Sequence, residues 1–270
     1  MPWTVIKPPR LDNGPLLAFC VLMDVKTAIR TVELFEMFAE VGKPMTLSEI
    51  ARALNAPHSS CFNLVRSLES CGYLYSVGGN KRTYPTRKLF DNATAIASYE
   101  PAIPHIRPVL TALRDAVDET VILGALHGKR AIYLAVVEGR QTIRYSARAG
   151  DLKPLYGSAI GKALLMAMTP VNREKIARSL TFERVTDGTI ANAKALLAEL
   201  NESEKRGYAR TVSEHVAEVG AIGCPVVVDG VVYSVAIAGP AARIVPASDD
   251  LAARIKAALA DVERSARDRG

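Results

Sequence analysis

The stretch from Thr46 to Pro85 constrains the fold of this chain most, because it has the pattern of two short helices followed by a basic hairpin. Thr46 and Glu49 have the Thr-x-x-Glu spacing of a capping box, which predicts a helix start, and the apolar residues that follow recur at helical spacing. Asn55 can take the left-handed conformation that ends such a helix. A second helix is predicted from about position 57, and its apolar face is formed by Cys61, Phe62, Val65 and Leu68.

A hairpin is predicted directly after these helices. Gly72 is placed to end the second helix, and residues 73–77 and 81–84 are strand-like. Gly78, Gly79 and Asn80 supply the positive-φ turn between the two strands. Two helices and such a hairpin are the layout of a winged helix-turn-helix, whose second helix enters the major groove of DNA. We therefore expect a DNA-binding domain over residues 25–86, which begins with a further amphipathic helix at 26–41. The residues of that helix expected to face the core are Ile29, Val32, Leu34, Phe35 and Phe38.

The polar residues of this domain are candidate DNA contacts. Short hydroxyls at a helix start suit phosphates, because the first N–H groups of a helix are free. Asn63 could pair with an adenine edge, and Arg66 with a guanine edge or a phosphate. The alternative is that these side chains are merely solvated. The candidate set consists of Thr46, Ser48, His58, Ser59, Ser60, Asn63, Arg66, Lys81 and Arg82.

Length and charge agree with a two-domain protein that binds a polyanion. The chain has 270 residues and a net charge of +6. Residues 25–90 hold nine Lys and Arg against five Asp and Glu, a net charge of +4 in that region. A basic domain of this kind suits double-stranded DNA.

Cysteine usage and hydropathy indicate a cytoplasmic protein. The four cysteines, which show no Cys-x-x-Cys spacing, are interpreted as buried small apolar residues in a reducing compartment, and no metal or cofactor is predicted. The apolar run at 15–23 is too short for a membrane span, and a signal peptide is not expected. Residues 1–24 are interpreted as an extension that is partly disordered or docks on a neighbouring subunit.

The rest of the chain predicts linker helices within 87–118 and an α+β domain over 119–270. Such an antiparallel sheet, with helices on one side, leaves a concave face where a small molecule can sit. Asp229-Gly230 is a hairpin signal. Strands are predicted at 120–126, 131–137, 142–148, 208–212, 221–228 and 231–238, and helices at 157–168, 171–180, 193–206 and 248–267.

Four segments of the chain together resemble the IclR family of bacterial transcriptional regulators. They are PHSSCFNLVRSLESCGYL at 57–74, LKPLYGSAIGKALLMAM at 152–168, RVTDGTIANAKALLAELNESEKRGYA at 184–209 and EVGAIGCPVVVDGVVYSVAIAGPAARI at 218–244. The resemblance implies a GAF-like domain that binds a small organic acid. It also implies homodimers, in contact through helices 26–41 and 87–98, that can pair into tetramers. His58 stands where a basic residue is usual and Asn63 where Arg is common, which implies a different base preference.

Carried over residue by residue, the family's ligand site lies between the loop before the Gly-Lys-Ala helix and the last two strands. Ala236 and Ala238 stand where members that bind small 2-oxo acids can have Ser, so a more hydrophobic effector such as an aromatic acid is expected. Tyr145 could stack on a ring, and Arg148, Lys153 or His215 could neutralise a carboxylate. The alternative is that the two alanines only pack the sheet. The candidate set consists of Tyr145, Arg148, Lys153, Ser158, Ala159, Ile160, His215, Cys224, Pro225, Ala236 and Ala238.

Two other function classes are weighed against this one. Cys224 and His215 could be a nucleophile and base of an enzyme, but no third orienting group and no Gly-rich elbow accompany them. The chain also has no phosphate loop or dinucleotide fingerprint, so an enzyme is not expected. The second alternative is a winged-helix protein that binds no small molecule.

Overall fold

A computed structural model describes residues 25–78, 81–98 and 103–267. The chain divides into two compact units, the first ending at Ala97 and the second beginning at Ser98, and each is described by itself. The boundary lies within the interval 87–118, where the sequence predicts linker helices. The predicted extension at 1–24 and two residues of the hairpin turn, Gly79 and Asn80, lie outside the described residues.

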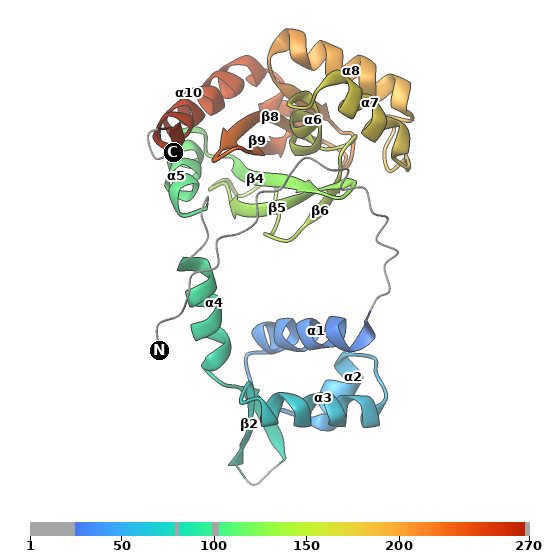
Figure 1. Cartoon of the computed structure of the whole chain (residues 1–270), viewed down its shortest axis with the longest axis vertical. Helices are drawn as coiled ribbons and strands as arrows, with labels where there is room; N and C mark the ends of the chain where they lie inside the picture. Colours follow the sequence, from blue (N-terminus) through green and yellow to red (C-terminus); the bar gives the residue numbers. More distant parts are fainter. Residues whose placement is uncertain (1–24, 79–80, 99–102, 268–270) are drawn as a thin grey trace, which may run out of the picture. The chain divides into compact units, whose positions relative to one another are not determined.

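The first unit contains the predicted helix pair and hairpin (Figure 1). Its strands form a small antiparallel sheet in the order β1-β3-β2. The elements are α1 (Lys26–Val41), β1 (Met45–Thr46), α2 (Leu47–Ala53), α3 (His58–Ser70), β2 (Leu74–Val77), β3 (Arg82–Pro85) and α4 (Lys88–Ser98).

Local signals fix the ends of these helices as predicted. The capping box forms in both directions, because the Thr46 backbone N–H donates to Glu49 Oε2 at 2.7 Å and the Glu49 N–H donates to Thr46 Oγ1 at 3.3 Å. Asn55 and Gly72 follow α2 and α3 in left-handed conformations, with φ of 44° and 74°. These residues therefore define the helix-turn-helix locally, before any packing is considered.

Packing in the first unit corrects the predicted burial of four residues, Phe62, Cys71, Ile29 and Val32. Phe62 is 50% exposed, and Leu64 is buried beside Cys61 and Val65 instead. The reason is the helical period, because positions 61, 64, 65 and 68 form one stripe, and position 62 lies beyond its edge. Cys71 is exposed, since it follows the last turn of α3. On the predicted core face of α1, two residues lie outward, Ile29 (43% exposed) and Val32 (58% exposed).

The second unit is built on a six-stranded antiparallel sheet in the order β6-β5-β4-β9-β8-β7. The predicted α+β class is confirmed, and the Asp229-Gly230 turn joins β8 to β9 with both φ angles positive. The strands are β4 (Thr120–His127), β5 (Arg130–Val137), β6 (Leu152–Pro154), β7 (Ala209–Val212), β8 (Val219–Val228) and β9 (Val231–Pro240). The helices are α5 (Ile103–Val117), α6 (Ala159–Met166), α7 (Pro170–Ser179), α8 (Ala193–Arg206), α9 (Ala241–Ile244) and α10 (Ser248–Arg267).

The prediction of a strand at 142–148 is wrong. This segment is not a strand, and β5 pairs at the sheet edge with the short strand β6 instead. In segment 142–148, two backbone carbonyls accept hydrogen bonds from side chains and not from a neighbouring strand. Arg243 Nη2 donates to the carbonyl of Ile143 at 2.8 Å, and the Thr120 hydroxyl donates to the carbonyl of Tyr145. Local β-propensity in this segment is therefore overridden by tertiary contacts.

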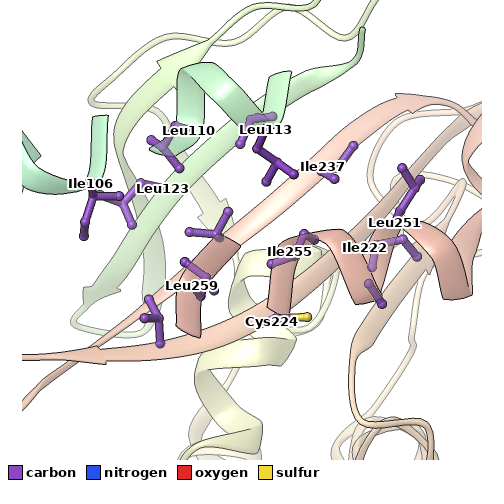
Figure 2. Close-up of a cluster of buried hydrophobic side chains, with 14 of the residues drawn as sticks. Ile106, Leu110, Leu113, Leu123, Ile222, Cys224, Ile237, Leu251, Ile255 and Leu259 are labelled. Atoms are coloured by element: carbon purple, nitrogen blue, oxygen red, sulfur yellow. The ribbon is translucent and has the colours of Figure 1, made fainter. Parts of the chain in front are cut away.

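Helices cover both faces of the sheet, so the predicted one-sided arrangement is also wrong. One face packs on α5 and α10, as Figure 2 shows for an apolar cluster that includes Leu110, Ile237 and Ile255. The other face packs on α6, with α7 and α8 beyond it (Figure 1). The burial of both faces explains the continuous apolar run Val-Ile-Leu at the start of β4, since alternation is lost when neither face meets water.

Candidate functional site

The exposed face of α3 carries most of the predicted DNA contacts. His58, Ser59, Asn63 and Arg66 are exposed, and their spacing places them along one side of the helix. Pro57 precedes α3, and within the described part of the chain no side chain caps the first N–H groups of this helix. This helix start therefore retains free donors that a phosphate can accept from. The remaining candidates of the helix pair are exposed Ser48 and half-buried Ser60.

Two of the predicted contacts, Thr46 and Arg82, are engaged within the unit. Arg82 Nη1 donates to Glu49 Oε2 at 3.1 Å and to the carbonyl of Pro44 at 2.9 Å. The Thr46 backbone and hydroxyl are hydrogen-bonded to the same carboxylate, and these bonds lower the pKa of Glu49. Arg82 therefore joins the hairpin to the start of α2. Lys81 beside it is exposed, with a φ of 51°.

A small cavity lies on the α6 side of the six-stranded sheet. Its volume is about 40 Å³, and its floor is formed by side chains of β4, β8 and β9. The first turn of α6 and the segment from Glu214 to Val216 form further walls. The lining residues are Ile122, Tyr133, Tyr145, Lys153, Gly157, Ser158, Ala159, Ile160, Thr211, Glu214, His215, Val216, Val219, Ala221, Ala236 and Ala238.

Glycines bring α6 close enough to the sheet to form this wall. A Cβ added to Gly223 on β8 would lie 2.6 Å from the carbonyl oxygen of Ala159. A Cβ on Gly161 would lie 2.4 Å from the Cα of Leu155. Neither distance is compatible with a side chain, so only glycine permits the backbone contact that holds Ala159 and Ile160 over the cavity floor.

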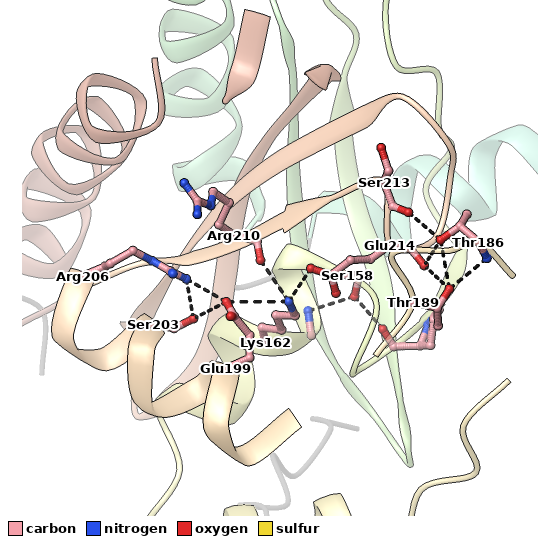
Figure 3. A network of polar contacts seen from close by, with 12 residues as sticks. Ser158, Lys162, Thr186, Thr189, Glu199, Ser203, Arg206, Arg210, Ser213 and Glu214 are labelled. Atoms are coloured by element: carbon pink, nitrogen blue, oxygen red, sulfur yellow. Dashed lines mark hydrogen bonds and ion pairs between the residues drawn. The ribbon is translucent and has the colours of Figure 1, made fainter. Parts of the chain in front are cut away.

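A buried ion pair joins α6 to the segment that carries His215, as Figure 3 shows. Lys162 is fully buried, and its Nζ lies 2.7 Å from Glu214 Oε1 and 3.0 Å from the carbonyl oxygen of Arg210. Thr186 and Thr189 hold the same segment from the other side. Thr189 Oγ1 donates to the carbonyl of Glu214 at 2.7 Å, and Thr186 Oγ1 donates to that of Ser213 at 2.5 Å. The two residues that precede His215 are thus held by α6 and by the threonines, which positions His215.

Lys153 and His215 are the lining side chains that could meet an anionic ligand. Burial lowers the pKa of His215, and the nearby charges of Lys153 and Arg130 lower it further. Lys153 Nζ is 3.3 Å from Asp151 Oδ2 and 5.6 Å from the centre of the Tyr133 ring. Lys153, which shares its charge with Asp151, and His215 in its protonated form are therefore the groups of the lining that could pair with a carboxylate in this partly desolvated site.

Eight of the eleven predicted effector residues line this cavity, and Arg148, Cys224 and Pro225 do not. Arg148 is exposed, and Pro225 lies farther along β8. Cys224 points to the opposite face of the sheet, into the apolar cluster of α5 and α10 (Figure 2), because side chains alternate along a strand. Burial raises the pKa of the Cys224 thiol to about 11. His215 lines the cavity on the other face of the sheet. Cys224 and His215 therefore lie on opposite sides of the sheet and cannot act as a nucleophile and its base.

Several residues of the site were missed by sequence reasoning. Ala221 lines the cavity, whereas Cys224 was expected to do so. The two residues are three positions apart on β8, so their side chains point to opposite faces of the sheet. Lys162 and Glu214 are separated by 52 positions, and a buried lysine has no local signal. Thr186 and Thr189 lie in the segment at 184–209 that carries part of the family resemblance, and both hydroxyls hydrogen-bond to the backbone before His215.

Comparisons with known proteins cover almost the whole described chain. A model for the C-terminal domain of bacterial transcriptional regulators of the IclR type matches residues 96–264, and a model for the IclR helix-turn-helix domain matches residues 27–78. The HTH-type regulator BhcR of Paracoccus denitrificans is 27% identical over 222 residues, which cover 82% of this chain and 79% of that protein. KipR of Bacillus subtilis is 30% identical over 203 residues, which cover 74% and 80%.

Solved structures show the same fold. The crystal structure of the Thermotoga maritima IclR aligns with a TM-score of 0.72 at 24% identity, over 88% of this chain and 98% of that one. An IclR homolog from Microbacterium hydrocarbonoxydans, crystallised with 4-hydroxybenzoate, aligns with a TM-score of 0.67 at 21% identity, over 88% and 99%. At these identities the likeness supports the architecture.

A winged helix with an exposed polar face on its second helix, joined to a second domain that contains a cavity, defines a class of protein: the transcriptional regulator that carries both domains on one chain. Among the described helices, none combines the length and the hydropathy needed to span a bilayer. The chain belongs to the IclR family of bacterial transcriptional regulators. Its predicted assignment as a regulator rather than an enzyme is confirmed.

Proposed function

We propose that this cytoplasmic regulator binds a pseudopalindromic operator through α3 and the hairpin, and that a small organic acid in the cavity of the second unit changes its operator affinity. The observation that supports the acid is the cavity itself, in which Lys153 and His215 lie beside the apolar floor formed by β4, β8 and β9. The ligand acts on DNA binding only if it binds two arrangements of the protein unequally. A typical coupling of about 1–3 kcal/mol would change operator affinity roughly 5- to 150-fold.

The proposed effector is a compact aromatic acid. Ala221, Ala236 and Ala238 make the floor of the cavity apolar and free of hydroxyls. Tyr145 is half-buried at its edge and can stack on a ring. The cavity of about 40 Å³ is smaller than a ring, so binding requires side chains such as Ile160 and Tyr145 to move. The Microbacterium homolog crystallised with 4-hydroxybenzoate makes that acid the first candidate.

Calorimetry tests this assignment with benzoate, 4-hydroxybenzoate and pyruvate as titrants. The parent protein is expected to bind an aromatic acid more tightly than pyruvate. Ala236→Ser/Ala238→Ser should weaken the aromatic acid, because hydroxyls replace apolar floor. Ala252→Ser is the matched control, since Ala252 is equally buried but packs on the other face of the sheet. If both variants bind every acid as the parent does, positions 236 and 238 do not line the ligand site.

DNA binding is tested by the salt dependence of affinity. Lys81→Ala should reduce the slope of log K against log salt by roughly 0.9 for a lost phosphate contact. Lys175→Ala, an exposed lysine on α7, is the control and should change nothing. Asn63→Ala should instead relax base preference, at about 1–3 kcal/mol for a good bidentate pair. If Asn63→Ala loses the same affinity for operator and for random DNA, Asn63 contacts the DNA backbone and not a base edge.

Self-association is part of the proposal, because a two-fold operator requires a two-fold protein. Apolar side chains are exposed on α1 and α4, where the family resemblance places the dimer contacts. They include Val32 (58%), Phe90 (58%) and Ile96 (73%). We expect dimers, which can pair further. Sedimentation that gives only the 29.1 kDa species at micromolar concentration would exclude the dimer.

A further inference from the structure

Phe62 is an aromatic residue on the outer face of α3, among the polar residues proposed to contact DNA. Its side chain is 50% exposed, whereas Cys61 and Leu64 on either side of it are buried in the core of the first unit. The exposed positions 58, 59, 62, 63 and 66 recur at helical spacing, so Phe62 shares one face with them. The packing of this unit therefore does not account for a phenyl ring at this position.

The surroundings of the ring are basic. The Arg66 guanidinium lies 5.9 Å from the ring centre. Phe62 also borders a groove of about 270 Å³ between α3 and the hairpin, whose charged lining residues are Arg66, Lys81, Arg82 and Glu69. Arg82 is paired with Glu49, and Arg66 and Lys81 still outnumber the one carboxylate of the lining. A partner that fits this face has to be anionic and has to offer an apolar group at the position of the ring. DNA has both properties, because its phosphates are anionic and thymine displays a methyl group.

We propose that Phe62 reads the C5-methyl group of a thymine in the major groove, next to the base edge met by Asn63 or Arg66. The methyl group distinguishes thymine from the other bases by an apolar contact, and Phe is a side chain suited to it. Phe62 then contributes sequence preference, whereas Lys81 and the hydroxyls at the start of α3 contribute affinity for the backbone. This inference rests on the proposed function, in which α3 enters the major groove.

The size of the effect follows from the area of one methyl group. Burying such a group is worth about 0.8 kcal/mol, which corresponds to roughly a fourfold change in affinity. The full ring buries more, so Phe62→Ala is expected to weaken operator binding by about tenfold. Binding to random DNA should be unchanged, since the phosphates make no contact with the ring.

The experiment begins with selection of the operator from a random DNA duplex pool by the unaltered full-length protein. Each thymine of the selected duplex is then replaced singly by deoxyuridine, which removes only the methyl group. The affinity of the unaltered protein should fall about fourfold when one particular thymine of each half-site is replaced by deoxyuridine. The affinity of Phe62→Ala should not change with the same replacement, and the affinity of Phe62→Leu should fall by less than fourfold. The full cycle of protein and DNA changes isolates the contact.

Other outcomes overturn the inference in distinguishable ways. If no deoxyuridine substitution weakens the unaltered protein, or if the selected sites contain no thymine near the Asn63 contact, Phe62 does not read a methyl group. If Phe62→Ala weakens operator and random DNA equally, the ring only supports the helix. Thermal unfolding of Phe62→Ala checks that the half-exposed side chain is dispensable for folding. If the unaltered protein enriches no sequence at all, the proposed function itself fails.

Discussion

Helices cover both faces of the six-stranded sheet, but the two faces are packed with different kinds of side chain. The face under α5 and α10 is a continuous apolar cluster in which Leu110, Ile237 and Ile255 are fully buried (Figure 2). The face under α6 contains the fully buried cation of Lys162, the carboxylate of Glu214 and the small cavity (Figure 3). A buried ion pair is costly to desolvate, and replacement by apolar residues often preserves or raises stability.

This difference indicates a division of roles between the faces. The apolar face stabilises the domain, since dense packing there has no polar requirement. On the α6 face, Lys162, Thr186 and Thr189 hold the backbone on which His215 is placed. We infer that the polar network is present because it fixes the cavity wall. The variants below test whether changes on the apolar face alter only stability, whereas changes on the α6 face also alter ligand affinity.

The largest loss is expected from Lys162→Met. Glu214 would then remain buried without its cation, and breaking such a pair costs about 3–5 kcal/mol. Burial already raises the pKa of Glu214, so the deficit should shrink as the pH falls toward 4.5, the ordinary value for glutamate, because the protonated carboxyl needs no cation. Urea unfolding across pH measures both effects. Lys162→Met/Glu214→Gln should be less destabilised than the sum of the single variants. A loss below about 1 kcal/mol at neutral pH would mean that water replaces the cation.

Ile255→Ala tests the apolar face. Ile255 is fully buried on α10, and its truncation should cost about 2–5 kcal/mol, through lost burial and the remaining cavity. The loss should not depend on pH, and affinity for an aromatic acid should stay unchanged in the folded protein. Urea unfolding and calorimetry measure the two quantities. A large change in ligand affinity would show that the two faces are coupled.

Gly223→Ala addresses the contact between α6 and the sheet. The added Cβ would lie 2.6 Å from the carbonyl oxygen of Ala159, so α6 has to move away, and overpacking of this kind costs about 1–3 kcal/mol. Ligand affinity should fall as well, since Ala159 and Ile160 shift with the helix. Gly157→Ala is the control for stability, because its Cβ would meet Pro154 at an ordinary 3.4 Å. Thermal unfolding that ranks the two variants equally would contradict the close approach.

The smallest effect concerns His215 and pH. Its pKa is lowered by burial, so the neutral imidazole stabilises the folded state fully above pH 6.5, and this contribution is lost as the pH falls through the lowered pKa. A bound carboxylate favours the protonated ring. Affinity for an acid should therefore rise as the pH falls from about 8 to about 6, by less than about tenfold per pH unit because at most one proton is taken up. His215→Gln should flatten the profile in calorimetry, and an unchanged profile would exclude His215.

Local signals in the sequence determined much of this protein. The capping box of Thr46 and Glu49, the left-handed Asn55 and Gly72, and the Asp229-Gly230 turn all appear as predicted. The bounds of α8 and α10 also agree with the predicted 193–206 and 248–267. Each of these features depends on residues within a few positions of one another, so backbone hydrogen bonding and periodicity suffice to specify it.

Only the tertiary structure decided which side chains meet. It placed Phe62 outside the core, directed Cys224 away from the cavity and Ala221 into it, and covered the second face of the sheet with helices. It also joined Lys162 to Glu214 across 52 positions. A change of one residue in strand phase, or of a fraction of a turn in helix phase, reverses the environment of a side chain. Such phases are fixed by the packing of distant segments, which the local pattern of residues does not contain.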